Sequence, residues 1–349
     1  MGRRVLVTGL ASFWGGRVAQ ALEADPGVEL IVGTDTDDPT VTLERTEFVR
    51  TDEGYSILAR LVRATQVDTV VHTFLVTDST QMSGRAMHEI NVIGTMNLLA
   101  AAGAPGSSVR QLVVKSSTLV YGASHRDPAC FREGMVRNTA AKTRVEKTLL
   151  AAESYLQDFA AGNPAVTVAV LRCADVLGAT IVTPISRALS LPAVPCIFGF
   201  DPLLQFVEEN DVLRALEFAM RAECAGVYNV AGDGRLPWSE VTAMVGKLPW
   251  PLPPALTSLS TVPLARLGLV DLPADVLAVL RFGRGVDNRR LKESGFEYTC
   301  STVDAVDRFR RASRVRNLRT LKRHEPGHRL NGDAEAFFQR SRAIRQPEH

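Results

Sequence analysis

The sequence has few cysteines and no long apolar run, and each lack excludes a class of protein. Its five cysteines, Cys130, Cys173, Cys196, Cys224 and Cys300, are scattered and form no CxxC pair. We therefore expect reduced, mostly buried thiols and no metal site. No run of about 18 apolar residues occurs, so no membrane span is expected. The N-terminal stretch MGRRVLVTGL has too short an apolar run for a signal peptide, which favours a cytoplasmic protein.

Charge is nearly balanced over the whole chain, with a formal net charge of +2, but not along it. From Arg308 to the end there are 12 basic and 4 acidic residues, a net of +8. Clustered arginines can bind phosphates, yet this tail has few aromatic residues to stack on bases and no DNA-binding motif, so no nucleic-acid partner is expected. A solvated helix, or a contact with the acidic body or a partner, is predicted instead. An amphipathic membrane-surface anchor is a further alternative.

The first half of the chain alternates continuous apolar runs with helical patterns. Strands are predicted over residues 3–9, 29–35, 67–74, 109–117 and 166–172, and helices over 15–25, 55–65, 86–103 and 138–161. Apolar strands that alternate with helices indicate a parallel sheet covered on both faces. The predicted fold is therefore α/β, a Rossmann-type doubly wound sheet.

After Gly178 the pattern loosens into proline-containing segments and short elements. We predict a Rossmann domain over residues 1–178 and a smaller, partly discontinuous substrate domain over 179–307, with segments that rejoin the first domain. Residues 308–349 form the basic C-terminal tail.

The segment VLVTGLASFWGG joins the first predicted strand to the first predicted helix. Backbone N–H groups and the helix dipole at such a junction can hold a diphosphate. Gly9 and Gly15 take the turn and packing positions of a dinucleotide-binding loop, while Ser12 replaces the middle glycine. The Ser12 hydroxyl could itself donate to phosphate. The loop residues Gly9, Ser12, Phe13, Trp14 and Gly15 are predicted to bind the cofactor.

Asp35 ends the second predicted strand, 20 residues after Gly15. A carboxylate at this position accepts from the adenosine ribose hydroxyls and repels a 2′-phosphate. The sequence therefore predicts NAD rather than NADP as the cofactor.

Eight motifs in order resemble the extended short-chain dehydrogenase/reductase family, the NAD-dependent epimerase/dehydratases that include UDP-glucose 4-epimerase. They are VTGLASFWGG, DTVVHTF, NVIGTMNLL, KSSTLVYG, AAKTRVEK, VLRCADVLG, FVEENDVLRAL and YNVAGDG. By this resemblance Ser117 matches the catalytic serine and Lys142 the lysine that holds the nicotinamide ribose. Asp52 matches an aspartate beside the adenine, and Asn91 the asparagine of the third motif. The resemblance also implies a homodimer.

The chain departs from the family pattern at the proton-transfer position. The family has a tyrosine four residues before the lysine, one helical turn away on the same face, and here that residue is Asn138. An amide does not ionise near neutrality and cannot replace the tyrosine as an acid. Tyr121 and His125 are the alternatives considered for this role.

The predicted substrate site departs as well. Leu204 replaces the family arginine that meets the sugar-nucleotide diphosphate, Glu208 replaces a histidine, and Asp175 replaces an asparagine. Loss of a cation and gain of a carboxylate both disfavour a diphosphate ligand. Two functions stay open: an NAD-dependent oxidoreductase acting on a nucleotide sugar or other secondary alcohol with an atypical proton relay, and a non-catalytic NAD-binding sensor or scaffold.

Overall fold

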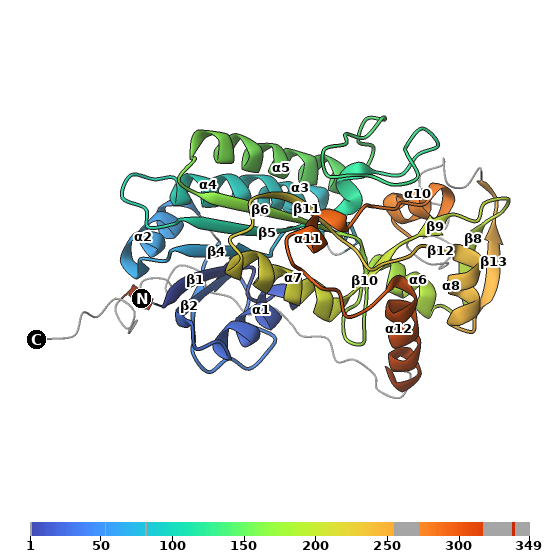
Figure 1. Ribbon diagram of the computed structural model, residues 1–349, viewed down its shortest axis with the longest axis horizontal. Coiled ribbons are helices and arrows are strands. Elements are labelled where there is room, and N and C mark those ends of the chain that lie inside the picture. The colour runs from blue at the N-terminus through green and yellow to red at the C-terminus, as the bar shows by residue number, and fades with distance from the viewer. Residues whose placement is uncertain (1, 53, 81, 255–271, 317–336, 339–349) are drawn as a thin grey trace, which may run out of the picture.

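A seven-stranded parallel sheet forms the centre of the protein (Figure 1). The computed structural model describes all residues except 1, 53, 81, 255–271, 317–336 and 339–349. The strand order is β11-β6-β5-β4-β1-β2-β3. The strands are β1 (Arg3–Thr8), β2 (Val28–Asp35), β3 (Thr46–Arg50), β4 (Thr69–His72), β5 (Gln111–Ser117), β6 (Thr167–Cys173) and β11 (Gly226–Val230). Every pairing in this sheet is parallel, so the predicted doubly wound α/β fold is confirmed.

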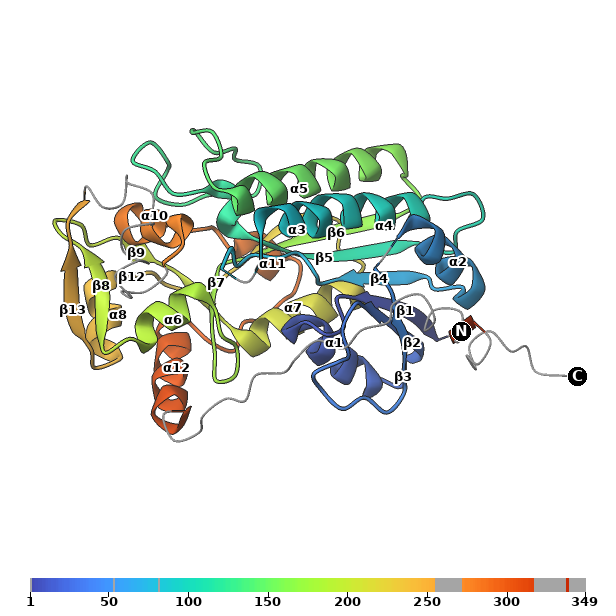
Figure 2. The same ribbon diagram turned by 180° about the vertical axis from the view of Figure 1, so that it is seen from behind.

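Helices cover both faces of the sheet, which explains why its strands are continuously apolar (Figures 1 and 2). One face carries α2 (Tyr55–Thr65), α3 (Gly84–His88), the π-helical segment η1 (Glu89–Gly94), α4 (Thr95–Ala102) and α5 (Arg144–Gly162), and the other carries α1 (Phe13–Glu23) and α7 (Glu209–Arg221). The strand β3 was not predicted. Its residues are half-exposed except Val49, so the segment lacks the apolar run that marks the central strands.

The helix α5 begins at Arg144 and not at the predicted residue 138. Thr143 caps it, because its hydroxyl accepts from the backbone N–H of Glu146 at 3.2 Å. The Glu146 carboxylate accepts from the backbone N–H of Lys142 at 2.8 Å and pairs with Arg137 at 3.0 Å. These contacts fix the start of the helix after Thr143, so Asn138 and Lys142 precede it. The prediction that these two residues lie one helical turn apart is wrong.

A second apolar cluster lies beyond the carboxyl ends of the strands. Its helices are α6 (Pro184–Ser190), α8 (Trp238–Met244), α10 (Ala274–Phe282) and α12 (Thr302–Arg316). Three strand pairs accompany them: β7 (Asp175–Leu177) with β10 (Phe206–Glu208), β8 (Ala193–Ile197) with β13 (Leu248–Leu252), and β9 (Leu203–Leu204) with β12 (Leu236–Pro237). The remaining elements are the 3₁₀ turn η2 (Thr118–Tyr121) and α11 (Arg289–Glu293).

The helix α12 crosses residue 308, where the basic tail was predicted to begin. Its Phe309 is buried in the second cluster, so the first part of the predicted tail packs against the protein body. Of the later tail only Phe337 and Phe338 lie within the described residues. Phe337 is buried against the main core, and Arg60 on α2 lies over the Phe338 ring.

Candidate functional site

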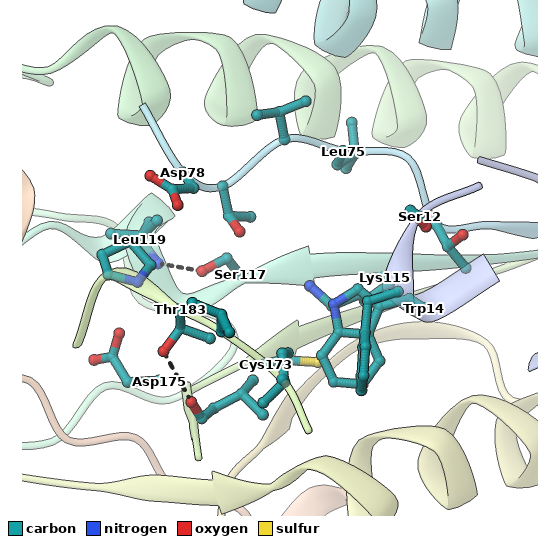
Figure 3. A pocket seen from close by; sticks show the side chains of 18 of the residues that line it. Ser12, Trp14, Leu75, Asp78, Lys115, Ser117, Leu119, Cys173, Asp175 and Thr183 are labelled. Carbon is teal, nitrogen blue, oxygen red and sulfur yellow. Dashed lines mark hydrogen bonds between the residues drawn. The ribbon is translucent and has the colours of Figure 1, made fainter. Parts of the chain in front are cut away.

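A cavity of about 250 Å³ lies at the carboxyl ends of β1, β4, β5 and β6 (Figure 3). Ligands of doubly wound folds bind at this end of the sheet. The cavity is lined by residues 12–14, 73–78, 115, 117, 119, 173–176, 181–184, 275 and 276. It therefore brings together the glycine loop, the end of β5 and segments of the second cluster.

The glycine loop is shaped by two close backbone approaches. Gly9 has φ of 77°, and a Cβ there would lie 2.6 Å from the Cβ of Phe74. A Cβ on Gly15 would lie 2.0 Å from the carbonyl oxygen of Gly9, so α1 packs directly on the loop. Both positions require glycine, as a dinucleotide-binding loop does.

Ser12 completes this loop by capping α1. Its hydroxyl donates to the Gly9 carbonyl at 2.6 Å and accepts from the Gly15 N–H at 3.0 Å. The expectation that this hydroxyl donates to phosphate is therefore wrong, because its proton is already used inside the loop. Among the described residues no group accepts from the backbone N–H of Phe13 or Trp14, the first two residues of α1. Those two donors fit an anion.

Asp35 lies beside the same loop. Its carboxylate accepts from the N–H of Ala11 at 2.8 Å and of Thr36 at 2.7 Å. Burial raises the pKa of this carboxyl above its usual value, although these N–H groups act in the opposite direction. Asp52 follows the neighbouring strand β3, is exposed, and accepts from the N–H of Gly54 at 3.2 Å. Neither carboxylate lines the cavity.

The end of β5 places two polar side chains in the cavity wall. Ser117 is 9% exposed, and its hydroxyl oxygen accepts from the N–H of Leu119 at 3.2 Å. No described residue accepts from its O–H, which leaves that proton for a ligand. Lys115, two residues earlier on the same strand face, is 4% exposed, and its amine lies 5.1 Å from the centre of the Trp14 ring (Figure 3).

Of the three residues at the family's catalytic positions, Ser117, Asn138 and Lys142, the last two lie outside the cavity. Asn138 is exposed, and its amide donates to the carbonyl of Arg126 at 2.7 Å. The Lys142 side chain is also exposed. Asn91 does not line the cavity but holds Val76, which does. Its side-chain amide accepts from the Val76 N–H at 2.7 Å and donates to the Val76 carbonyl at 2.9 Å.

Neither alternative acid reaches the cavity. Tyr121 is 1% exposed, donates to the amide oxygen of Asn229 at 2.8 Å and accepts from Arg172 at 2.8 Å. Burial also raises the pKa of this phenol. His125 is exposed beside Phe282. The geometry gives Tyr121 a packing role.

Three carboxylates that sequence reasoning did not assign together line the cavity. Asp78 pairs with Arg187 at 2.8 Å, and Asp175 pairs with Arg284 at 3.0 Å. Asp275 on α10 is 5% exposed, and burial raises its pKa to about 6. These contacts join segments far apart in the chain, and no local pattern marks them.

Two other residues that differ from the family pattern, Leu204 and Glu208, stabilise the fold. Leu204 is buried in the second cluster, and Glu208 caps α7 by accepting from the Asn210 N–H at 2.8 Å. The sequence signal that was missed is Lys115, since a charged residue within the apolar strand QLVVKSS, two positions before Ser117, must face the same side.

Within the described ranges, no helix is both long and apolar enough to cross a membrane. The same part of the chain holds no group of three or more His, Cys, Asp or Glu side chains arranged to bind a metal ion.

A family model and a relative match most of the chain. The family model described as "NAD dependent epimerase/dehydratase family" matches residues 5–231. An uncharacterized protein of Mycobacterium tuberculosis strain H37Rv is 34% identical over 312 residues, which is 87% of this chain and 82% of that protein.

Solved structures of epimerases are similar over most of the chain. A UDP-glucuronic acid 4-epimerase from Bacillus cereus in complex with NAD matches with a TM-score of 0.68 and 17% identity, covering 89% of this chain and 99% of that one. A UDP-glucose 4-epimerase from Thermotoga maritima with UDP-glucose matches with a TM-score of 0.66 and 19% identity, covering 90% and 100%. At these identities the similarity shows a shared fold.

Proposed function

The chain belongs to the NAD dependent epimerase/dehydratase family, and from this premise we propose that it binds NAD and oxidises or reduces a secondary alcohol carbon of its substrate. One observation carries the proposal: the first turn of α1, with two free backbone N–H groups, and the free hydroxyl of Ser117 line the same cavity. A cofactor site and a substrate-activating hydroxyl are thus adjacent.

The glycine loop and α1 are the proposed cofactor site. Gly9 and Gly15 allow close approach, the N–H groups of Phe13 and Trp14 are free to donate to a diphosphate, and Asp35 is the proposed partner of the adenosine ribose. Bound NAD would supply the hydride acceptor. Asp52 and Asn91 stay predicted cofactor contacts, and Asn91 supports the wall through Val76. Lys142, which the resemblance assigns to the nicotinamide ribose, is exposed outside the cavity and is not part of the proposed site.

Ser117 is the proposed group that contacts the reacting oxygen. Its oxygen already accepts from Leu119, so its own proton is directed to a ligand. A hydroxyl held this way stabilises negative charge that develops on an alkoxide or carbonyl oxygen. No tyrosine lines the cavity in the described part of the chain, so the proton relay that we propose differs from the tyrosine relay of the resembled family.

The substrate class that we propose is a nucleotide sugar or another compound with a secondary alcohol. Two structurally similar proteins are complexes with UDP-glucose. Leu204 offers no cation to a diphosphate here. Arg187 and Arg284, however, form ion pairs with two of the carboxylates that line the cavity. A ligand that displaces either ion pair would meet an arginine.

A non-catalytic NAD sensor is the second candidate. The observation that favours it is the exposure of Asn138 and Lys142, since neither reaches the cavity. A homodimer stays part of the proposal, and exposed Ile93, Met96 and Tyr155 on η1, α4 and α5 support it.

The test begins with protein purified without added nucleotide. Mass spectrometry and absorbance at the NADH band should reveal NAD or NADH, and calorimetry should show NAD binding to the emptied protein. A panel of nucleotide sugars and simpler secondary alcohols then separates the candidates. Reduction of bound NAD, or conversion of any of them to an isomer or a dehydrated product with the hydride returned from NADH, supports the oxidoreductase. NAD binding with neither result across the panel supports the sensor. Absence of NAD binding contradicts both.

A further inference from the structure

Lys115 is a buried lysine that lines the cavity. It extends from the central strand β5, is 4% exposed, and lies between Ser117 and Trp14 in Figure 3. Its nearest aromatic contact is the ring of Trp14, at 5.1 Å. Trp14 is the second residue of α1, and residues 12–14 line the same cavity as the amine.

No anion of the described part of the chain pairs with Lys115. Cys173 on the adjacent strand β6 is the titratable group that acts on it, but burial raises the pKa of that thiol to about 11, so it stays uncharged near neutrality. The carboxylates of Asp78 and Asp175 are paired with Arg187 and Arg284.

The other charged groups around the cavity do not neutralise Lys115 either. Asp275 on α10 interacts with Arg284, Asp175 and Glu146. Arg17 on α1 is a cation and donates to Asn210 at 3.0 Å. The Lys115 side chain is buried and its cation lies over the face of an indole ring, and burial lowers its pKa.

We propose that Lys115 contacts the diphosphate of the bound dinucleotide and takes up a proton as the dinucleotide binds. Two independent observations converge on this anion: the unpartnered amine and the free N–H groups at the start of an 11-residue helix. The inference rests on the proposed NAD site, but it adds a residue that no motif of the resemblance assigns and a linkage between binding and pH.

The sign of the linkage follows from the charge of the ligand. Without a ligand, burial favours the neutral amine; a diphosphate beside it favours the ammonium and raises the pKa of Lys115. Affinity for NAD is then greatest below the pKa of the free protein. It falls by up to about tenfold per pH unit as pH rises toward the pKa of the complex.

The experiment is titration calorimetry of the full chain, emptied of copurified nucleotide, in buffers of different ionisation enthalpy from pH 6.5 to 9.5. The ligands are NAD, ADP-ribose, UDP and adenosine. NAD and ADP-ribose should bind with uptake of up to one proton, whereas adenosine, which has no phosphate, should bind with none.

Three variants isolate the amine. Lys115→Met keeps the chain length of the side chain and should abolish proton uptake, with about 10- to 100-fold weaker NAD binding at pH 6.5. Lys115→Arg keeps a permanent charge, so NAD should bind to it without proton uptake and with no pH slope. Lys147→Met removes an exposed lysine on α5 and should behave as the unchanged chain. Melting temperatures report whether each variant folds.

The outcomes separate this inference from the proposed function. NAD binding without proton uptake, at an affinity that Lys115→Met leaves unchanged, overturns the role of Lys115 while the NAD site stands. Uptake with NAD but not with ADP-ribose overturns the diphosphate contact in favour of the nicotinamide half. Uptake with UDP alone overturns the dinucleotide contact and assigns the amine to the substrate. No NAD binding at any pH overturns the proposed function itself.

Discussion

The end of β5 and the segment over residues 137–143 both hold residues at the family's catalytic positions, yet their polar side chains have opposite surroundings. Lys115 and Ser117 are buried in the cavity wall on a strand with hydrogen-bonded neighbours on both sides. In the other segment Asn138 and Lys142 are exposed. The neighbouring Arg137 is buried, but its guanidinium pairs with Glu146 and would collide with a Cβ on Gly122.

One of the two regions therefore supplies polar groups to the cavity, whereas the other stabilises the start of α5. The β5 side chains are held by the central sheet, and such fixed groups supply preorganised polar contacts. Before α5, Thr143 caps the helix and Arg137 pairs with Glu146 in its first turn. The cavity therefore depends on β5 for its chemistry, and the predictions below test that division.

The largest effect is expected inside the cavity. Ser117→Ala removes the hydroxyl that we assign to the reacting oxygen and should lower turnover by about 10²- to 10³-fold, as loss of one such donor does. NAD affinity should change by less than about threefold, because the hydroxyl is not assigned to the cofactor. Initial rates on a substrate found in the alcohol panel, with calorimetry for NAD, make the measurement.

Lys142→Met is the matched variant outside the cavity. Since this side chain is exposed and does not line the cavity, turnover should stay within about threefold of the unchanged chain. A loss as large as that of Ser117→Ala would show that the segment before α5 moves into the cavity when a ligand binds.

A smaller effect is expected at the far end of the cofactor site. The Asp35 carboxylate stands beside the glycine loop, where it accepts from Ala11. NAD should bind at least about tenfold more tightly than NADP, and Asp35→Ala should reduce that ratio, because the charge that repels a 2′-phosphate is gone. Equal affinities of the unchanged chain for NAD and NADP would remove this role from Asp35.

Asp275 connects the two regions, since it lines the cavity and interacts with Glu146 at the start of α5. Its pKa of about 6 in the folded state lies above the usual value of 3.8, chiefly because of burial. Folding therefore favours the protonated carboxyl. The free energy of unfolding should fall as pH rises from about 4 through about 6.

Asp275→Asn removes this cost. At pH 8 the variant should be more stable than the unchanged chain by about 1 to 3 kcal/mol, and at pH 4 the two should differ little. Denaturant unfolding at both pH values measures the difference, with Asp158→Asn, an exposed aspartate on α5, as the control. Equal stabilisation at both pH values would point to a cause other than titration.

The sheet was predictable from the sequence because burial on both faces leaves a local record. The apolar runs that became β1, β2, β4, β5 and β6 are such a record, and the glycine loop adds two backbone requirements at Gly9 and Gly15. Ser117 was predicted from its motif, and the structure places it at the end of β5, where it lines the cavity.

The start of α5 and the ion pairs of the cavity were not predictable from local sequence patterns. Motif spacing placed Asn138 on a helix, but a cap at Thr143 and an ion pair between Arg137 and Glu146 decide where that helix begins. The pair of Asp175 and Arg284 joins residues 109 positions apart in the chain. Such contacts depend on packing between separate segments, which no local pattern contains.

The smallest effect is expected where the sequence alone would place the largest. If residue 138 lay one helical turn from Lys142, Asn138→Tyr would restore a proton-transfer group and raise turnover by about 10²- to 10⁴-fold. In the structure the Asn138 amide instead donates to the Arg126 carbonyl, and the residue is exposed outside the cavity. We therefore expect turnover to change by less than about twofold, measured on the same substrate as for Ser117→Ala. A gain of 10²-fold or more, with a rate that rises through a new pKa, would mean that residues 138–143 join α5 during the reaction, and the division between the two regions would then hold only for the ligand-free protein.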